Sequence, residues 1–151
     1  MCRIKMKNKK LIVFDMDGVL IDVSGSYRET VRQTARLFFS IAPSSEILPD
    51  PLFPLADLAV VKQSGGLNND WDLSCLVINL LFNQIEKPPV YRSKDPWAQY
   101  EETVSQCHVG ALGDFLRSTA KPLTAMLQKA GKTKNAFIYD LYTGDVGSGN
   151  I

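Results

Sequence analysis

The sequence has few of the residues that build metal clusters or disulfide frameworks. Its 151 residues include three cysteines, Cys2, Cys75 and Cys107, and one histidine, His108. The cysteines are too widely spaced to form a disulfide framework or a set of metal ligands. Cys107 and His108 are adjacent, and neighbouring residues on a helix point to different faces, so we expect no shared ligand or catalytic role for them. A reducing cytoplasm is therefore the expected location.

The sequence also lacks an excess of one charge and a long apolar run. Seventeen Lys and Arg are balanced by 16 Asp and Glu, for a net charge of +1, which argues against a nucleic-acid-binding surface. Five basic residues fall among the first ten, and a solvated terminus explains them better than a binding arm. The apolar runs at residues 11–14 and 75–82 are far shorter than the roughly 20 residues that a membrane-spanning helix needs. We therefore expect neither nucleic acid nor membrane as a partner.

One short apolar run has the character of a strand. Residues 10–14, Lys-Leu-Ile-Val-Phe, are rich in β-formers, which suits a strand buried on both faces of a parallel sheet. No partner strand can be identified elsewhere in the chain. An unpaired buried strand would leave its backbone groups without hydrogen bonds.

Helical patterns dominate the rest of the chain. The predicted helices span about residues 27–38, 55–63, 71–85, 96–106, 114–120, 122–130 and 136–142. Gly110 and Gly113 are expected to separate the fourth helix from the fifth. The third helix is apolar almost all the way round, which predicts the centre of a helical bundle. Its core candidates are Trp71, Leu76, Val77, Leu80 and Leu81.

Two aspartates directly follow the predicted strand. Asp15 and Asp17 are separated by one residue and followed by Gly18, and open α/β sheets bind ligands outside the carboxyl ends of their strands. Asp15 can attack phosphorus as a nucleophile, and Asp17 can protonate the leaving oxygen and then deprotonate the attacking water. Gly18 permits the sharp turn that brings the backbone close to a phosphoryl group. Two close carboxylates facing a phosphate repel one another unless a hard cation is bound, so Mg²⁺ is the expected cofactor, with Asp15 and Asp17 as its ligands.

The same residues admit simpler interpretations. An Asp-x-Asp-Gly sequence also suits a turn or a calcium loop. An EF-hand loop does not fit, because Gly18 is followed by Val-Leu-Ile-Asp and no glutamate closes a twelve-residue loop. A plain turn capped by the two aspartates stays open on these residues alone.

The stretch Leu11-Ile-Val-Phe-Asp-Met-Asp-Gly-Val-Leu-Ile-Asp22 resembles the first motif of the haloacid dehalogenase-like (HAD) hydrolases, in its phosphatase form. The true dehalogenases of that superfamily lack the second aspartate, so Asp17 indicates phosphoryl transfer. The resemblance implies an aspartyl nucleophile at Asp15, an acid/base at Asp17, and Mg²⁺ held by the Asp15 carboxylate and the Asp17 main-chain carbonyl. It predicts a Mg²⁺-dependent phosphomonoester hydrolase that acts on a small phosphorylated metabolite through an aspartyl-phosphate intermediate.

The helices that follow resemble the α-helical cap that one HAD subfamily inserts between its first and second motifs. Residues 24–28, 62–73 and 144–150 are similar to segments of a poorly characterised branch of that subfamily. A polar loop that leads into a helix offers backbone donors to an anion. A helix C-cap followed by an N-cap is the alternative for the same residues. The predicted substrate-binding residues are Gly18, Arg28, Lys62, Asn68 and Asn69.

The expected fold is therefore α/β, with a HAD-like Rossmann-type core represented only by its first strand and catalytic loop, residues 1–22, and a mainly α-helical cap, residues 23–151. The later family motifs cannot be assigned; residues 134–145 mimic the last one but are predicted to belong to the cap. We expect the front portion of a larger enzyme, with little activity alone because preorganised charge is missing. The missing core portion or a second copy of the chain would be its partner. The alternative is a non-catalytic helical binding module or a decayed HAD remnant.

Overall fold

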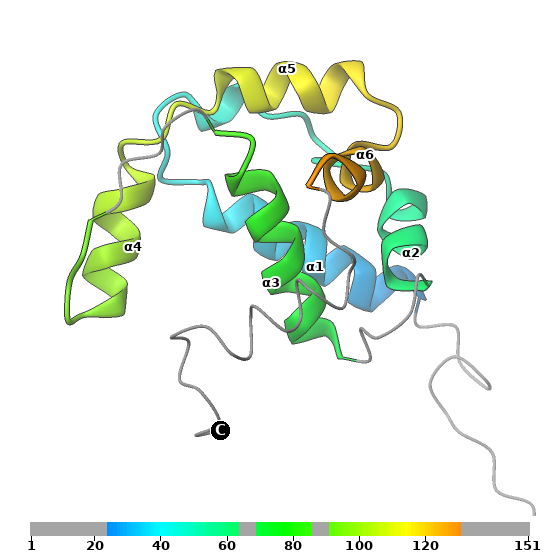
Figure 1. Cartoon of the computed structure of the whole chain (residues 1–151), viewed down its shortest axis with the longest axis horizontal. Coiled ribbons are helices and arrows are strands. Elements are labelled where there is room, and N and C mark those ends of the chain that lie inside the picture. The colour runs from blue at the N-terminus through cyan, green and yellow to red at the C-terminus, as the bar shows by residue number, and fades with distance from the viewer. Residues whose placement is uncertain (1–23, 64–68, 86–90, 131–151) are drawn as a thin grey trace, which may run out of the picture.

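The computed structural model describes residues 24–63, 69–85 and 91–130. All regular structure in these residues is helical (Figure 1). The elements are α1 (Ser24–Phe38), a short 3₁₀ helix η1 (Ser45–Ile47), α2 (Leu55–Gln63), α3 (Asp70–Phe82), α4 (Pro96–Val104), α5 (Gly110–Ser118) and α6 (Pro122–Lys129). None of these helices has the length and apolar character needed to cross a membrane.

The core is formed where α1, α2, α3 and α6 pack against one another. Helix α3 lies at its centre and contacts both α1 and α6. Each fully buried aliphatic or aromatic side chain contributes about 1.5–3 kcal/mol of transfer free energy. The largest fully buried side chains of these four helices and their flanks are Phe39, Phe53, Leu58, Leu73, Leu80, Leu81, Leu123 and Met126.

Helix α6 begins against a buried carboxylate from α2. Asp57 is 1% exposed and accepts hydrogen bonds from the Leu123 N–H at 2.7 Å, the Thr124 N–H at 3.3 Å and the Thr124 hydroxyl at 2.5 Å. The first N–H groups of a helix have no partner within the helix, and a negative charge there is favoured by the helix dipole. The N-cap of α6, Lys121, makes no side-chain capping bond, so Asp57 supplies the capping acceptor from α2 and ties α2 to α6.

Arginines hold the irregular segment between α1 and α2. Arg36 donates to the carbonyls of Leu48 and Pro49 at 3.1 and 2.8 Å, and Arg32 donates to the carbonyl of Phe53 at 3.1 Å. Carbonyls that are not paired in a helix or sheet need such donors when they lie near a core. Two arginines of α1 therefore fix this proline-rich segment.

Helix α4 stands to one side of the four packed helices (Figure 1). Tyr100 joins α4 to the end of α1: its hydroxyl donates to the Phe38 carbonyl at 2.8 Å, and its ring centroid lies 5.1 Å from that of Phe38. Val104 of α4 is buried. Helix α4 begins at Pro96, where the sequence predicts its start, and its N-cap Asp95 accepts a hydrogen bond from the Trp97 N–H at 2.9 Å.

The expected α/β fold is wrong: the described residues contain no β-strand, and they form a helical fold. The one strand that the sequence predicts, residues 10–14, lies outside the described residues, as does the last predicted helix, 136–142. Helices satisfy their backbone hydrogen bonds within one segment, whereas a strand requires a partner that the sequence does not supply.

Two finer expectations are also wrong. Trp71 was a core candidate but is 84% exposed, because it lies in the first turn of α3 and its side chain points away from the bundle. Helix α5 begins at Gly110 and runs through Gly113, where the sequence predicts a break. A Cβ at Gly113 would lie 3.1 Å from the Ile47 carbonyl oxygen, so this glycine permits a close approach of helix and loop. The other core candidates, Leu76, Val77, Leu80 and Leu81, are buried as predicted.

Candidate functional site

The described residues contain only part of the predicted site. Asp15, Asp17, Gly18 and Asn68 lie outside them, so the predicted nucleophile, acid/base and Mg²⁺ ligands stay predictions. Within the described ranges, no group of three or more His, Cys, Asp or Glu side chains could hold a metal ion. The residues that the structure places are Arg28, Lys62 and Asn69.

Lys62 joins the end of α2 to the start of α3. Its ammonium lies 2.8 Å from the Asp70 carboxylate, and the two side chains are 32% and 35% exposed. A half-exposed pair of this kind contributes at most about 1 kcal/mol. The ammonium can therefore exchange Asp70 for another anion at a small loss of stability.

Asn69 is the N-cap of α3. Its amide oxygen accepts a hydrogen bond from the Asp72 N–H at 2.8 Å, and its amide nitrogen donates to the Asp72 carboxylate at 2.8 Å. The amide oxygen and the amide nitrogen are therefore both bonded to Asp72, which fixes the Asn69 side chain at the N-terminus of α3. Asn69 is thus an N-cap, as in the helix-cap alternative, and its predicted role in substrate binding stays a prediction.

Two carboxylates carry negative charge at the start of α3. Asp70 and Asp72 both lie in its first turn, and carboxylates in that position offset the positive end of the helix dipole. The Cys75 thiol, one turn further on, has a raised pKa because it is partly buried and because Asp72 lies nearby. An added anion at this end would therefore have to replace Asp70 beside Lys62.

Arg28 lies in the second turn of α1 and is partly buried. The first turns of α1, the end of α2 and the start of α3 gather at one end of the helical unit (Figure 1), where α1 packs against α2 and α3. Three of the predicted substrate-binding residues therefore come from this same end. Trp71, next to Asp70, is exposed at the same end. Its position in the first turn of a capped helix is the sequence feature that indicates this exposure.

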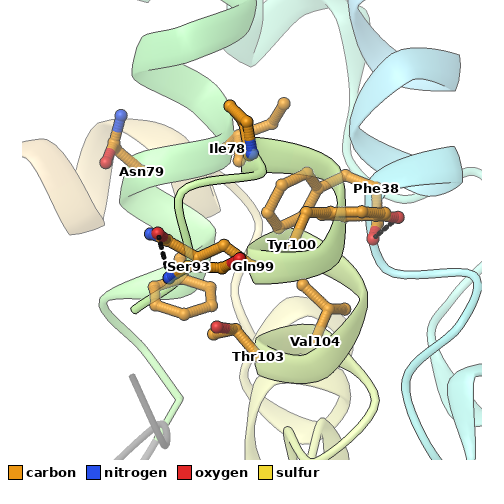
Figure 2. A pocket seen from close by; sticks show the side chains of 10 residues that line it. Phe38, Ile78, Asn79, Ser93, Gln99, Tyr100, Thr103 and Val104 are labelled. Atoms are coloured by element: carbon orange, nitrogen blue, oxygen red, sulfur yellow. Dashed lines mark hydrogen bonds between the residues drawn. The ribbon is translucent and has the colours of Figure 1, made fainter. Parts of the chain in front are cut away.

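A second feature that the sequence did not indicate is a recess of about 620 Å³ between α3 and α4. Figure 2 shows Phe38 and Tyr100 on one side of it and Asn79, Ser93 and Gln99 on the other. Its lining comes from segments that are far apart in the chain and becomes continuous only when α4 packs beside α3. Periodicity along one helix could not have revealed it.

Comparison with known proteins gives one partial match. No family model matches the chain, and no solved structure matches it. Over 63 residues, 42% of this chain, it is 36% identical to an imidazoleglycerol-phosphate dehydratase of Phytophthora nicotianae. The matched stretch is 12% of the length of that relative. The similarity is thus confined to a small part of a much longer protein.

Proposed function

We propose that this chain is part of a Mg²⁺-dependent phosphomonoester hydrolase of the HAD type, in which the helical unit serves as the cap. The observation that carries the proposal is the pair Asp15 and Asp17, spaced by one residue, preceded by an apolar run and followed by Gly18. Few other chemistries need two adjacent carboxylates in front of a glycine turn. The name of the partial relative, a dehydratase of a phosphorylated compound, agrees with a small phosphorylated metabolite as the substrate class.

The position of the candidate cap residues supports this assignment. Asp17 precedes Ser24, the first residue of α1, by seven residues, and a chain of that length spans at most about 25 Å. Arg28, Lys62 and Asn69 belong to the end of the helical unit from which α1 begins. This end is the part of the unit that can approach a phosphoryl group held at Asp15.

The proposed reaction has two steps. The Asp15 carboxylate attacks phosphorus, the ester oxygen leaves with a proton from Asp17, and an acyl phosphate forms on Asp15. Asp17 then takes a proton from water, whose oxygen attacks phosphorus and releases inorganic phosphate and the free Asp15 carboxylate. Bound Mg²⁺ supplies the positive charge that lets two carboxylates and a phosphate share one site. Lys62 would stabilise the incoming anion by leaving Asp70, with Arg28 beside the same end of the unit.

Activity requires more charge than these residues supply. Phosphoryl transfer depends on preorganised positive groups on several sides of the transferring group. In the proposal they come from a further core portion or from a second copy of the chain. The cytoplasm is the proposed location.

The test is Mg²⁺-dependent hydrolysis of p-nitrophenyl phosphate and of a panel of small phosphate esters. It is run on the 151-residue chain and, where the reading frame continues past Ile151, on the extended chain. The 151-residue chain should show little turnover, and the extended chain should lose its turnover on Asp15→Asn but keep it on Asp22→Asn, the matched control. Equal activity of the Asp15→Asn and parent chains, or no hydrolysis of any ester by the extended chain, would contradict the proposal.

A non-catalytic binding module is the second candidate. The neutral recess between α3 and α4 favours it, because such a site has no need of the aspartate pair. A chain that binds a ligand in this recess and hydrolyses no phosphate ester in any form would support this candidate over the first.

A further inference from the structure

The recess between α3 and α4 has the dimensions of a small-molecule site. Its volume of about 620 Å³ falls within the range of about 300–1,000 Å³ that is usual for ligand pockets. It is walled by the second half of α3, the length of α4 and the end of α1. It lies away from the Lys62–Asp70 pair, which belongs to the start of α3, so it is separate from the proposed phosphatase site.

One wall of the recess is aromatic and rigid. The Phe38 ring centroid lies 5.1 Å from that of Tyr100 at an interplanar angle of 55°, and 6.4 Å from that of Phe82 at 84°. The Tyr100 hydroxyl donates to the Phe38 carbonyl at 2.8 Å, which favours the position of the ring beside that of Phe38. Ile78 and Val104 complete the apolar surface. Such a wall suits a flat ring, which can pack edge to face or offset against these aromatic groups.

The opposite wall offers one acceptor and one donor. The Asn79 amide nitrogen donates to the Cys75 carbonyl at 2.8 Å, and the Gln99 amide oxygen accepts from the Ser93 N–H at 3.3 Å. Each of these bonds fixes one end of its amide. Asn79 is exposed and Gln99 partly exposed, and within the described part of the chain no hydrogen bond to protein involves the Asn79 oxygen or the Gln99 nitrogen. The oxygen can accept and the nitrogen can donate a hydrogen bond, and an amide group can make both kinds of bond.

The charge of the lining narrows the ligand class. None of the ten residues that line the recess carries a charge. A charged ligand would lose its hydration there without gaining a counter-charge, which is strongly unfavourable. A purely aliphatic ligand would gain no hydrogen bond from the amides on the polar wall, whereas a ligand with a polar edge would.

We propose that this recess binds a small neutral aromatic molecule that carries an amide or lactam edge. The ring lies against Phe38 and Tyr100, and the amide edge pairs with Asn79 and Gln99. This binding does not depend on the proposed hydrolase activity. The site makes the helical unit a ligand-binding element in its own right.

The test uses benzamide as the probe and Trp97 as the reporter. Trp97 lies with its ring centroid 5.1 Å from that of Tyr100, and Trp71 is the other tryptophan of the chain. In the full chain carrying Trp71→Phe, benzamide should change the Trp97 fluorescence saturably, in the millimolar range expected for a fragment of this size. Benzoate, with the same ring and a charge, and acetamide, with the same amide and no ring, should each bind at least about tenfold more weakly.

Substitutions on α3 locate the site. Asn79→Leu should weaken benzamide binding about fivefold to tenfold, the loss expected for one hydrogen bond. Asn83→Leu is the matched control, because Asn83 is an exposed asparagine of the same helix end that does not line the recess, and it should leave binding unchanged. Circular dichroism of both variants confirms that the helices are intact.

Four results would overturn the proposal. Three of them are the absence of a saturable response to benzamide, equal binding of benzamide and benzoate, and equal affinities in the Asn79→Leu and Asn83→Leu variants. Tighter binding of N-acetylphenylalanine amide than of benzamide would also overturn it, because a ring on a flexible stem beside a peptide bond would then identify the recess as a peptide-docking site.

Discussion

Replacement of Asp57 by alanine should destabilise the helical unit more than any other single cap substitution in the described residues. The carboxylate is 1% exposed and binds three donors at the start of α6. Alanine would leave the Leu123 and Thr124 N–H groups and the Thr124 hydroxyl without the carboxylate. The Leu123 N–H is buried, whereas the Thr124 donors are only partly buried.

The magnitude follows from these three bonds. Loss of an ordinary N-cap costs about 1 kcal/mol, and a buried hydrogen bond to a charged group contributes about 1.5–3 kcal/mol. Since one carboxylate provides both effects, we expect the free energy of unfolding to fall by about 3 kcal/mol on Asp57→Ala. For a unit of roughly 100 residues this corresponds to a fall in Tm of about 12–20 °C. Thr124→Val, which removes one of the three donors, should cost about 1 kcal/mol.

Urea unfolding followed by far-UV circular dichroism at pH 7 measures this free energy. The matched control is Asp95→Ala, which removes the same kind of cap from α4 at an exposed position. That control should cost no more than about 1 kcal/mol, because water can replace the lost bond. If Asp57→Ala and Asp95→Ala shift the urea midpoint equally, the argument from burial is wrong.

Other substitutions probe the remaining contacts. Arg36→Ala should cost about 1–2 kcal/mol in urea unfolding, because the carbonyls of Leu48 and Pro49 lose their donor; a loss below about 0.3 kcal/mol would contradict this role. Gly113→Ala should fail to give the gain of up to about 1 kcal/mol usual for Gly→Ala in a helix, because its Cβ would approach the Ile47 carbonyl, whereas Gly25→Ala, with nothing within 4 Å of the new Cβ, should not be penalised. Burial, with a smaller effect of Glu101, raises the pKa of Tyr100. The contribution of Tyr100 to the free energy of unfolding should therefore be complete below the unfolded pKa of about 10 and be lost as the pH rises through the higher folded pKa. Tyr100→Phe should remove this loss of stability at high pH, and a variant with the same pH dependence of stability as the parent would refute the assignment to Tyr100.

Local features of the sequence were sufficient to predict most helices. The helices predicted over 96–106 and 71–85 start within one residue of α4 and α3, whose N-caps are Asp95 and Asn69. Such starts can be predicted because capping depends on a few adjacent residues. The burial of Leu76, Val77, Leu80 and Leu81 followed from an apolar pattern within one helix. The helix-cap interpretation of Asn69, left open by the sequence, is what the structure shows.

The errors share one physical cause. The α/β assignment rested on one predicted strand, residues 10–14, and on the resemblance to the HAD family, but a sheet needs partner strands, which a local pattern cannot supply. Trp71 was assigned to the core by its apolar character, but its exposure depends on which way the first turn of α3 faces. The break expected at Gly113 did not occur, because that glycine accommodates the Ile47 carbonyl of a distant segment.

The sequence by itself determined where most of the described helices lie and which chemistry the aspartate pair at positions 15 and 17 suggests, because capping, periodicity and motif spacing are encoded in neighbouring residues. Only the tertiary structure decided that Asp57 caps a helix more than sixty residues away in the chain, that Lys62 is paired with Asp70, and that α3 and α4 enclose a neutral aromatic recess. These features arise from contacts between distant segments, whose geometry is set by packing of the whole core and not by any one stretch of the chain.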